Sequence, residues 1–293
     1  MVRQQEMTSS SSRIGVVTGN IVSMRANPDA KSEQTTQALM GQTVMIEGGA
    51  QGWLYVQTWD TYRAWIPASA VRILPSAAEP YASVGAVAVI RDMFVDLRRK
   101  PHDRSEILTK VTIGAELEVV DPVDDWVELL LPDTRRAYIR KRDARLVDKD
   151  LAQTIPLPDP RKLVETARRF VGIPYLWGGT SPFGLDCSGF VQLVHKIHNI
   201  TLLRDAKDQA SDPRAVPIER NELQAGDLIF FAGDAITHVG MMIDKKTFIH
   251  SRGGIGVTTT PLDDPDYTSV YNCARRMRLA TLDPGGMPQP LLV

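Results

Sequence analysis

After position 187 the apolar residues recur at helical spacing, at Phe190, Leu193, Val194 and Ile197. This period predicts an amphipathic helix with one buried face. Cys187 lies on the same face, so its sulfur is expected to point toward whatever packs against the helix. Asp186 is a natural N-cap, and Gly184 supplies a turn ahead of it.

Three apolar runs farther along the chain predict neighbouring strands, at residues 226–231, 239–243 and 247–251. The last two runs flank the polar triplet Asp244-Lys245-Lys246, which predicts a hairpin. A hairpin centred on Asp244 sets His238 directly opposite His250, on one face of the sheet. A slip of one residue would place the two imidazoles on opposite faces.

The first half of the chain is a tandem repeat with an offset of 73 residues. Adding 73 to Arg25, Pro28, Ser32, Glu33, Thr36, Gly41, Trp53 and Asp60 gives the identical residues Arg98, Pro101, Ser105, Glu106, Thr109, Gly114, Trp126 and Asp133. Each copy has short β-rich runs separated by turn residues, at 43–46, 53–57 and 64–66 in the first and at 116–120, 126–130 and 137–140 in the second. This pattern is typical of a small β-barrel. Short proline-rich breaks at 75–80 and 148–160 are expected to be stiff.

Composition narrows the class of protein. The 293 residues suggest two domains, or three small ones, and the net charge of −1 gives no reason to expect nucleic acid as a partner. Because no apolar run approaches the roughly 20 residues that span a bilayer, we expect no membrane insertion. The polar segment 1–12 has no hydrophobic signal core, which favours a cytoplasmic protein; removal of a signal peptide from a periplasmic or extracellular protein would leave the same pattern.

The candidate chemistry centres on a cysteine and two histidines. In the first turn of a helix, unpaired amides and the helix dipole favour the thiolate, so the pKa of Cys187 is expected to be lowered. His238 or His250 could serve as its base. The three residues could instead bind zinc, although they lack CxxC or HxxxH spacing, and a lone cysteine can simply be packing. His195 and His198 are expected on the solvated face of the helix. The second cysteine, in residues 270–274, is expected in a core strand, where a disulfide to the first would consume the nucleophile.

Five motifs in order resemble the NlpC-type cell-wall cysteine peptidases: Tyr175-Leu176-Trp177-Gly178-Gly179, Asp186-Cys187-Ser188-Gly189-Phe190, Gly226-Asp227-Leu228, His238-Val239-Gly240 and Phe248-Ile249-His250. The resemblance covers about 120 residues, and the repeats resemble bacterial SH3-like domains. Together the two resemblances imply a multi-domain protein, with two small all-β SH3-like barrels at 14–75 and 85–148 followed by an α+β papain-like cysteine peptidase domain at 161–281. The family's catalytic triad maps onto Cys187, His238 and His250.

The resemblance also implies a substrate and its contacts. The expected reaction is hydrolysis of the bond between γ-D-Glu and an L-diamino acid in murein peptides with a free N-terminal L-Ala, as in peptide recycling. Glu33 and Tyr62 on the first barrel would hold the free amine, with the carboxylate of Glu33 buried beside it. The remaining site residues are implied to be Tyr175 as an oxyanion donor, Asp186 and Ser188 as substrate contacts, and Trp177 as a cleft wall. The segment 203–205 lacks the family's proline, so we assign it a structural role.

Other functions remain open from the residues alone. The same enzyme could act outside the cell as a wall-remodelling hydrolase, or the chain could be a non-catalytic wall-binding protein with a relic peptidase domain. An amidase or acyltransferase would use the same thiol chemistry. We expect a monomer that needs no cofactor or metal. The choice between meso-diaminopimelate and lysine is not encoded in any motif.

Overall fold

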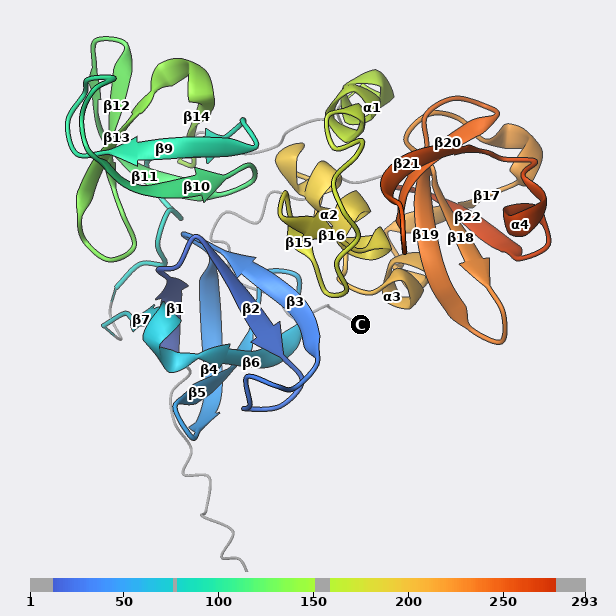
Figure 1. Ribbon diagram of the computed structural model, residues 1–293, viewed down its shortest axis with the longest axis horizontal. Coiled ribbons are helices and arrows are strands. Elements are labelled where there is room, and N and C mark those ends of the chain that lie inside the picture. The colour runs from blue at the N-terminus through green and yellow to red at the C-terminus, as the bar shows by residue number, and fades with distance from the viewer. Residues whose placement is uncertain (1–12, 76–77, 151–158, 278–293) are drawn as a thin grey trace, which may run out of the picture.

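The computed structural model describes residues 13–75, 78–150 and 159–277. We call these ranges the first β unit, the second β unit and the third unit. Parts of the predicted breaks at 75–80 and 148–160, the polar segment 1–12 and the end of the predicted third domain at 278–281 lie outside the described residues. Figure 1 shows the two β units side by side, with helices between them and the sheet of the third unit.

The first β unit is one seven-stranded antiparallel sheet with the order β3-β2-β6-β5-β4-β1-β7. Its elements are β1 (Arg13–Val17), β2 (Ile21–Arg25), β3 (Gln34–Leu39), β4 (Thr43–Ala50), β5 (Trp53–Gln57), β6 (Arg63–Pro67), the short 3-10 helix η1 (Ala68–Ala70) and β7 (Val71–Ile73). Alternate residues of these strands meet in a single apolar core.

The second β unit repeats this arrangement in the order β10-β9-β13-β12-β11-β8-β14. Its elements are β8 (Ala86–Ile90), β9 (Phe94–Arg98), β10 (Ile107–Thr112), β11 (Glu116–Val123), β12 (Trp126–Leu130), β13 (Arg136–Arg140), η2 (Lys141–Asp143) and β14 (Ala144–Asp148). Each begins 73 residues after its counterpart, and only β14 differs in length. Gly41 and Gly114, which the offset pairs, have φ values of 87° and 82°. The structure therefore confirms the repeat and its register.

The third unit packs helices against a six-stranded antiparallel sheet with the order β17-β22-β18-β19-β20-β21. Its elements are α1 (Pro160–Arg168), β15 (Thr180–Ser181), β16 (Gly184–Leu185), α2 (Cys187–Ile197), α3 (Ala206–Ser211), β17 (Ala215–Ile218), η3 (Arg220–Glu222), β18 (Leu228–Ala232), β19 (Ile236–Met242), β20 (Thr247–Arg252), β21 (Gly256–Pro261), α4 (Pro265–Thr268) and β22 (Tyr271–Met277). None of the helices in the described ranges has the length and apolar content to cross a bilayer.

Helix α2 begins where the sequence predicts. Asp186 is its N-cap, and its carboxylate accepts a hydrogen bond of 2.7 Å from the amide of Gly189. The helix is buried almost all round, because the β units cover the side that does not face the sheet. The prediction for His195 is therefore wrong: its side chain is buried, with Nδ1 2.7 Å from the carbonyl of Val191. His198 is half-buried rather than solvated, and its Nε2 lies 2.8 Å from the hydroxyl of Thr166.

The hairpin of β19 and β20 has a different register from the predicted one. Met241 pairs with Ile249 and Met242 with Phe248, so the centre falls on position 245 rather than 244. Continuing this register, His250 lies opposite Gly240. His238 precedes Gly240 by two residues in β19. A displacement of two residues keeps both imidazoles on one face. The turn is longer than predicted because the Asp244 carboxylate accepts hydrogen bonds from the amides at 246 and 247.

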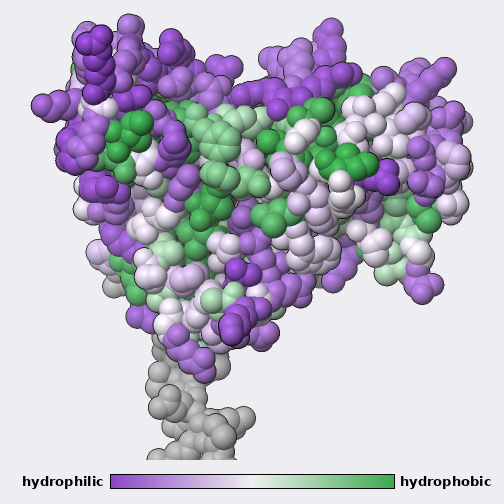
Figure 2. Space-filling model, viewed as in Figure 1, coloured by the Kyte–Doolittle hydropathy of each residue, from purple (hydrophilic) through white to green (hydrophobic). Residues whose placement is uncertain are grey.

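Both β units contact the third unit, the first through β15 and the second through α2. Gln37 of β3 accepts hydrogen bonds from the Thr180 amide (3.0 Å) and the Ser181 hydroxyl (2.9 Å). Lys196 of α2 donates to the carbonyl of Gly114 in the second β unit at 3.1 Å. Figure 2 shows apolar residues across the middle of one face and polar residues along its outer edges. These contacts hold the first β unit against β15 and the second β unit against α2.

Gly240 is required by the histidine opposite it. A Cβ at this position would lie 2.7 Å from Cδ2 of Phe248 and 3.3 Å from Cβ of His250. We expect Gly240→Ala to lower the free energy of unfolding by about 1–3 kcal/mol, because a fully packed interior must shift to admit the methyl group. Urea denaturation measures this change. Gly48→Ala is the control, since a Cβ there meets nothing within 4 Å; equal stability of the two variants would contradict the packing argument.

Candidate active site

The two histidines form a hydrogen-bonded pair inside the third unit. Nε2 of His238 lies 2.7 Å from Nδ1 of His250, and Nε2 of His250 lies 3.0 Å from the hydroxyl of Thr260. If each Nε2 carries the proton, both contacts are donated in one direction, from His238 to His250 to Thr260. This tautomer leaves Nδ1 of His238 as an unprotonated nitrogen that can accept a proton.

Cys187 lies at the start of α2, across from β19. Its sulfur is 4.0 Å from the carbonyl oxygen of Thr237, the residue before His238. Cys187 and His238 line one cavity of about 400 Å³ together with Tyr175. The structure thus brings the predicted nucleophile, the base and the orienting histidine into one place. Within the described ranges, no hydrogen bond joins the thiol directly to an imidazole.

Burial sets the protonation states, and here one expectation is wrong. It raises the pKa of the Cys187 thiol to about 11, and the nearby carboxylate of Asp186 acts in the same direction. Burial also lowers the pKa of His238 to about 4, with a smaller contribution from the Arg252 guanidinium. The predicted thiolate at the helix start is therefore not favoured in the resting protein. The cost of removing charge from water exceeds the stabilisation by the helix dipole, and a neutral thiol faces a neutral imidazole.

The walls of the cavity are aromatic. The Tyr267 ring meets the His250 ring edge-on, with centroids 5.0 Å apart, and Phe231 lies 5.7 Å from His238. Burial, followed by the neighbouring Cys187, raises the pKa of Tyr175 to about 12, so its hydroxyl stays a hydrogen-bond donor at neutral pH.

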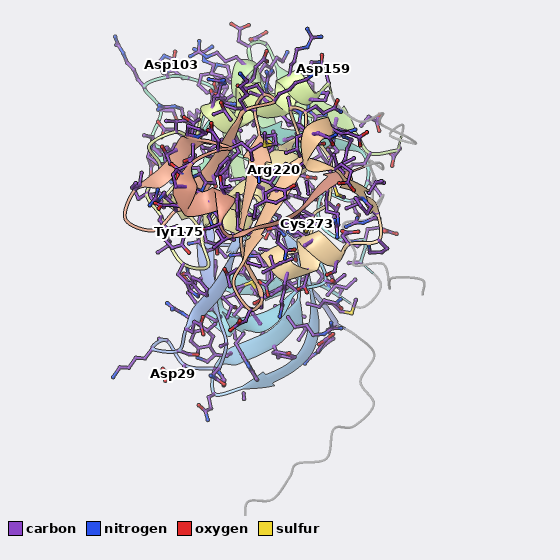
Figure 3. The ribbon with its side chains drawn as sticks, turned by 90° about the vertical axis from the view of Figure 1, so that its right-hand side faces the viewer. Asp29, Asp103, Asp159, Tyr175, Arg220 and Cys273 are labelled. Carbon is purple, nitrogen blue, oxygen red and sulfur yellow. The ribbon has the colours of Figure 1, made fainter. Side chains whose placement is uncertain are left out.

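Both cysteines are free, so the disulfide considered from the sequence is not formed. Cys273 lies in β22 and is only half-buried, so it is less buried than the expected core residue. In Figure 3, Cys273 lies apart from Tyr175, which lines the cavity. The cavity therefore contains one of the two thiols.

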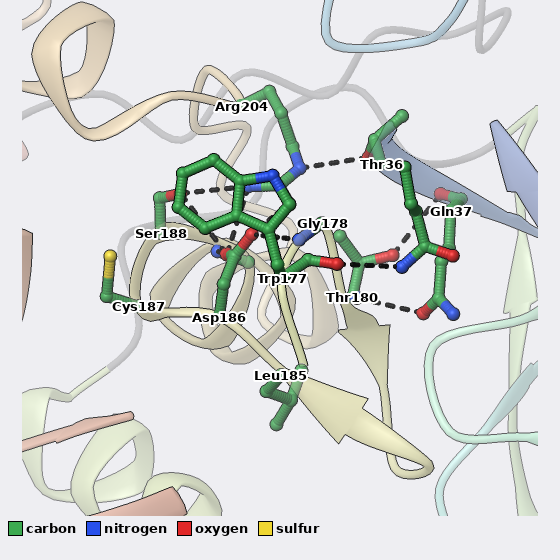
Figure 4. A network of polar contacts seen from close by, with 12 residues as sticks. Thr36, Gln37, Trp177, Gly178, Thr180, Leu185, Asp186, Cys187, Ser188 and Arg204 are labelled. Carbon is green, nitrogen blue, oxygen red and sulfur yellow. Dashed lines mark hydrogen bonds and ion pairs between the residues drawn. The ribbon is translucent and has the colours of Figure 1, made fainter. Parts of the chain in front are cut away.

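A buried ion pair anchors the start of α2 (Figure 4). Arg204 is 2% exposed and holds Asp186 through contacts of 2.5 and 3.1 Å. It also donates to the hydroxyl of Ser188 at 2.8 Å and to that of Thr36 in β3 at 2.9 Å. The Asp186 carboxylate accepts a further hydrogen bond of 2.9 Å from the amide of Gly178. All these contacts lie within the protein, so direct binding of substrate by Asp186 and Ser188 stays a prediction.

Glu33 lies at the junction of the first β unit with the third unit. One of its carboxylate oxygens accepts a 2.7 Å hydrogen bond from the indole nitrogen of Trp177. Glu33 is exposed, and the burial of its carboxylate beside a bound ammonium group stays a prediction. Its counterpart Glu106 is bound by Arg99 at 2.7 Å, whereas position 26, the counterpart of Arg99, is alanine. Glu33 thus has no arginine at the position where Glu106 has one, and it contacts the motif that precedes α2 instead.

Tyr62 does not line the cavity that contains the cysteine. It lines a second cavity of about 420 Å³, with Arg204 and Asp208 among the other residues. Burial raises the pKa of Tyr62, and the carboxylate of Asp205 adds to this effect. Trp177 is 61% exposed and does not belong to the lining of either cavity. The structure therefore places Tyr62 in a cavity separate from the reaction cavity, with two acidic residues and two arginines in its lining.

Sequence reasoning did not identify Thr260, Tyr267 and Arg252. Thr260 could have been found only from the pairing of β20 with β21, which sets it opposite Phe248, beside the histidine pair. Tyr267 and Arg252 lie outside the recognised motifs. Across the described residues, no group of three His, Cys, Asp or Glu side chains could hold a metal ion.

A helix that begins at a cysteine and packs on a sheet carrying a histidine relay is typical of papain-like hydrolases. Comparisons with known proteins agree with this class. The model of the NlpC/P60 family matches residues 172–276, and that of the bacterial dipeptidyl-peptidase SH3 domain matches residues 24–71, in the first β unit.

Relatives of similar length support the same assignment. A γ-D-glutamyl-L-lysine dipeptidyl-peptidase of Bacillus cereus is 33% identical over 258 residues, which cover 82% of this chain and 74% of that protein. Dipeptidyl-peptidase 6 of Lysinibacillus sphaericus is 28% identical over 257 residues, which cover 85% and 92%. The crystal structure of an NlpC/P60 protein of Bacillus cereus superposes with a TM-score of 0.80 at 26% identity, over 90% of this chain and 99% of that one. The chain belongs to the NlpC/P60 family and is a hydrolase of the peptidase class.

The protonation states can be tested by alkylation. In a Cys273→Ala variant, we expect the rate at which iodoacetamide modifies Cys187 to rise about tenfold per pH unit from pH 6 to 9, because the pKa of the thiol is raised to about 11. Peptide mass spectrometry measures this rate, and Cys187→Ala gives the reactivity of Cys273 alone. A rate that stays constant between pH 6 and 8 would show a preformed thiolate instead.

Proposed function

We propose that this protein is a cysteine peptidase that hydrolyses the γ-D-Glu–L-diamino acid bond of murein peptides with a free N-terminal L-Ala. The observation that carries this proposal is the shared cavity of Cys187 and His238, with His250 hydrogen-bonded behind His238. The names of the relatives support the choice of bond. A role in recycling murein peptides that have already been released from the wall follows from the requirement for a free amine.

The first half of the reaction forms an acyl-enzyme. Nδ1 of His238 takes the proton from Cys187 as the sulfur attacks the γ-carbonyl carbon of D-Glu. The imidazolium then gives this proton to the nitrogen of the diamino acid, and the C–N bond breaks. The peptide's L-Ala-γ-D-Glu part remains on the sulfur as a thioester. The neutral resting pair suits this sequence, because the proton moves only when the substrate is present.

The second half of the reaction returns the thiol. His238 takes a proton from water, the oxygen attacks the thioester carbonyl, and the sulfur leaves and recovers the proton. His250 orients His238 and stabilises its charged form, because Nδ1 of His250 accepts the hydrogen bond from Nε2. Thr260 fixes the tautomer of His250 in turn.

The negative charge on the carbonyl oxygen needs donors in both halves. The amide of Cys187, at the start of α2, and the hydroxyl of Tyr175 are the proposed pair. The raised pKa of Tyr175, about 12, keeps this hydroxyl protonated over the working range.

The first β unit supplies the recognition of the free amine. Glu33 and Tyr62 lie on this unit, and Asp205 influences Tyr62 from the third unit. An ammonium group beside the carboxylate of Glu33 would meet negative charge, whereas an acylated nitrogen carries no charge and adds bulk. Since the strands of the second β unit repeat those of the first at an offset of 73, we also infer that it is an SH3-like domain.

Two matched peptides test the proposal. One is L-Ala-γ-D-Glu-meso-diaminopimelate, and the other is the same peptide acetylated on the alanine nitrogen. We expect cleavage of the free-amine peptide at the Glu–diamino acid bond, with the acetylated peptide cleaved at least tenfold more slowly, because a hydrogen bond to a charged group contributes about 1.5–3 kcal/mol. Mass spectrometry identifies the products, and Cys187→Ala protein is the blank.

Glu33→Gln and its repeat counterpart Glu106→Gln form a matched pair of variants. Glu33→Gln should reduce the ratio of the cleavage rates of the free-amine and the acetylated peptide by about tenfold. Glu106→Gln should leave this ratio unchanged. Equal cleavage of both peptides by the unmodified protein would remove the amine pocket and favour a wall-remodelling hydrolase. Cleavage of neither would favour a non-catalytic binding protein.

A further inference from the structure

The reaction cavity contains a guanidinium group to which the mechanism gives no role. Arg252 is the last residue of β20, two residues after His250, and its half-buried side chain lines the cavity with Cys187 and His238. Its Cζ lies 5.8 Å from the centroid of the Tyr267 ring. Among residues 13–75, 78–150 and 159–277, no carboxylate forms an ion pair with it.

Three buried or partly buried arginines of the third unit are paired with aspartates. Arg204 is bound to Asp186, Arg214 to Asp212 and Arg276 to Asp227, each at 2.7 Å or less. An arginine in a partly enclosed aromatic cavity loses part of its hydration without recovering it from an anion of the protein. A carboxylate is the ligand whose geometry matches its planar donors.

The two cavities differ in charge and in location. The cavity of Tyr62 is lined in part by the first β unit, and its two acidic residues, Asp60 and Asp208, are balanced by two arginines, Arg63 and Arg204. The reaction cavity is lined by residues of the third unit, and no acidic residue belongs to the described lining. The proposed function places the free amine of the peptide at the first β unit, so the other end of the peptide, with its carboxylate, would lie toward Arg252. Cys187 and Arg252 line the same cavity.

We propose that Arg252 binds a carboxylate of the diamino acid that leaves, and so selects peptides that end at this residue. This inference rests on the proposed function and adds the recognition of the leaving side. The carboxylate has two sources, the α-carboxylate of either diamino acid and the side-chain carboxylate that diaminopimelate has and lysine lacks. In a longer peptide the α-carboxyl of the diamino acid is part of the next peptide bond. Such a peptide therefore offers Arg252 no free α-carboxylate.

Arg252 could instead act only on the histidines, because its charge contributes to the lowered pKa of both His238 and His250. A purely electrostatic role of this kind would affect every substrate alike. Recognition of a carboxylate affects only substrates that carry it. The two roles are therefore separated by comparing substrates rather than by comparing variants alone.

The experiment uses the full chain and four peptides. The parent is L-Ala-γ-D-Glu-L-Lys with a free C-terminus; the second has a C-terminal amide, and the third has an amide on the α-carboxyl of D-Glu. The fourth replaces lysine of the amidated peptide with meso-diaminopimelate, amidated only at its α-carboxyl. Values of kcat and KM are measured for the unmodified protein, Arg252→Gln, Arg252→Lys and the control Arg161→Gln, whose arginine is exposed at the start of α1.

For the unmodified protein, we expect kcat/KM to fall about tenfold to a hundredfold from the parent to the C-terminal amide, as for loss of a charged hydrogen bond. Arg252→Gln should lower kcat/KM for the parent peptide by a similar factor, mainly through a higher KM. It should change kcat/KM for the C-terminal amide by less than about twofold. Arg252→Lys should fall between them, and Arg161→Gln should match the unmodified protein. Recovery of activity with the fourth peptide would assign the side-chain carboxylate as a second source.

Three results would overturn the inference while the proposed function stands. They are equal cleavage of parent and C-terminal amide by the unmodified protein, an equal loss on both peptides in Arg252→Gln, and a dependence on Arg252 that disappears only when D-Glu is amidated. Cleavage of none of the four peptides by the unmodified protein would overturn the proposed function, and the inference with it. The activity of Arg252→Gln on the amide shows that this variant is folded.

Discussion

The active site depends on the buried ion pair of Arg204 and Asp186. The pair is almost wholly removed from water, where two charges are stable only if further hydrogen bonds satisfy them. Those hydrogen bonds come from the amides of Gly178 and Gly189 and the hydroxyl of Thr36, and thus from the motif before α2, from α2 itself and from the first β unit. Removing one partner of such a pair typically costs about 3–5 kcal/mol. One interaction therefore fixes the start of the helix that carries the thiol and holds the first β unit against it.

Comparison of the two β units shows which polar contacts distinguish the first unit from the second. Both β units have the same strands at a constant offset, yet their charges have different partners. Glu106 is neutralised by Arg99 on its own unit, whereas Glu33 bonds to Trp177 of the third unit. Asp60 likewise accepts a 2.7 Å hydrogen bond from Gln192 of α2, and its counterpart Asp133 binds Arg135. The polar side chains of the first copy thus contact α2 and the motif before it, where those of the second copy form pairs within their own unit.

Features of short range were predictable from the sequence. Helix α2 follows from its apolar period and its N-cap, and the strands of both β units follow from the repeat. The hairpin of β19 and β20 was predicted on the correct face, but its centre was one residue off because the Asp244 side chain closes a longer turn. Properties that depend on tertiary packing could not be predicted from the sequence. The raised pKa of Cys187 and the burial of His195 depend on packing between residues far apart in the sequence, and no local pattern records such contacts.

The most direct test of the central claim is to trap the acyl-enzyme. The protein is mixed with L-Ala-γ-D-Glu-meso-diaminopimelate, quenched in acid within the first turnover and digested for mass spectrometry. The account predicts that the peptide containing Cys187 carries one L-Ala-γ-D-Glu acyl group, and that acetylation of the alanine nitrogen greatly reduces this adduct. An adduct on Cys273, an adduct that retains the diamino acid, or product formation without any adduct would contradict the account.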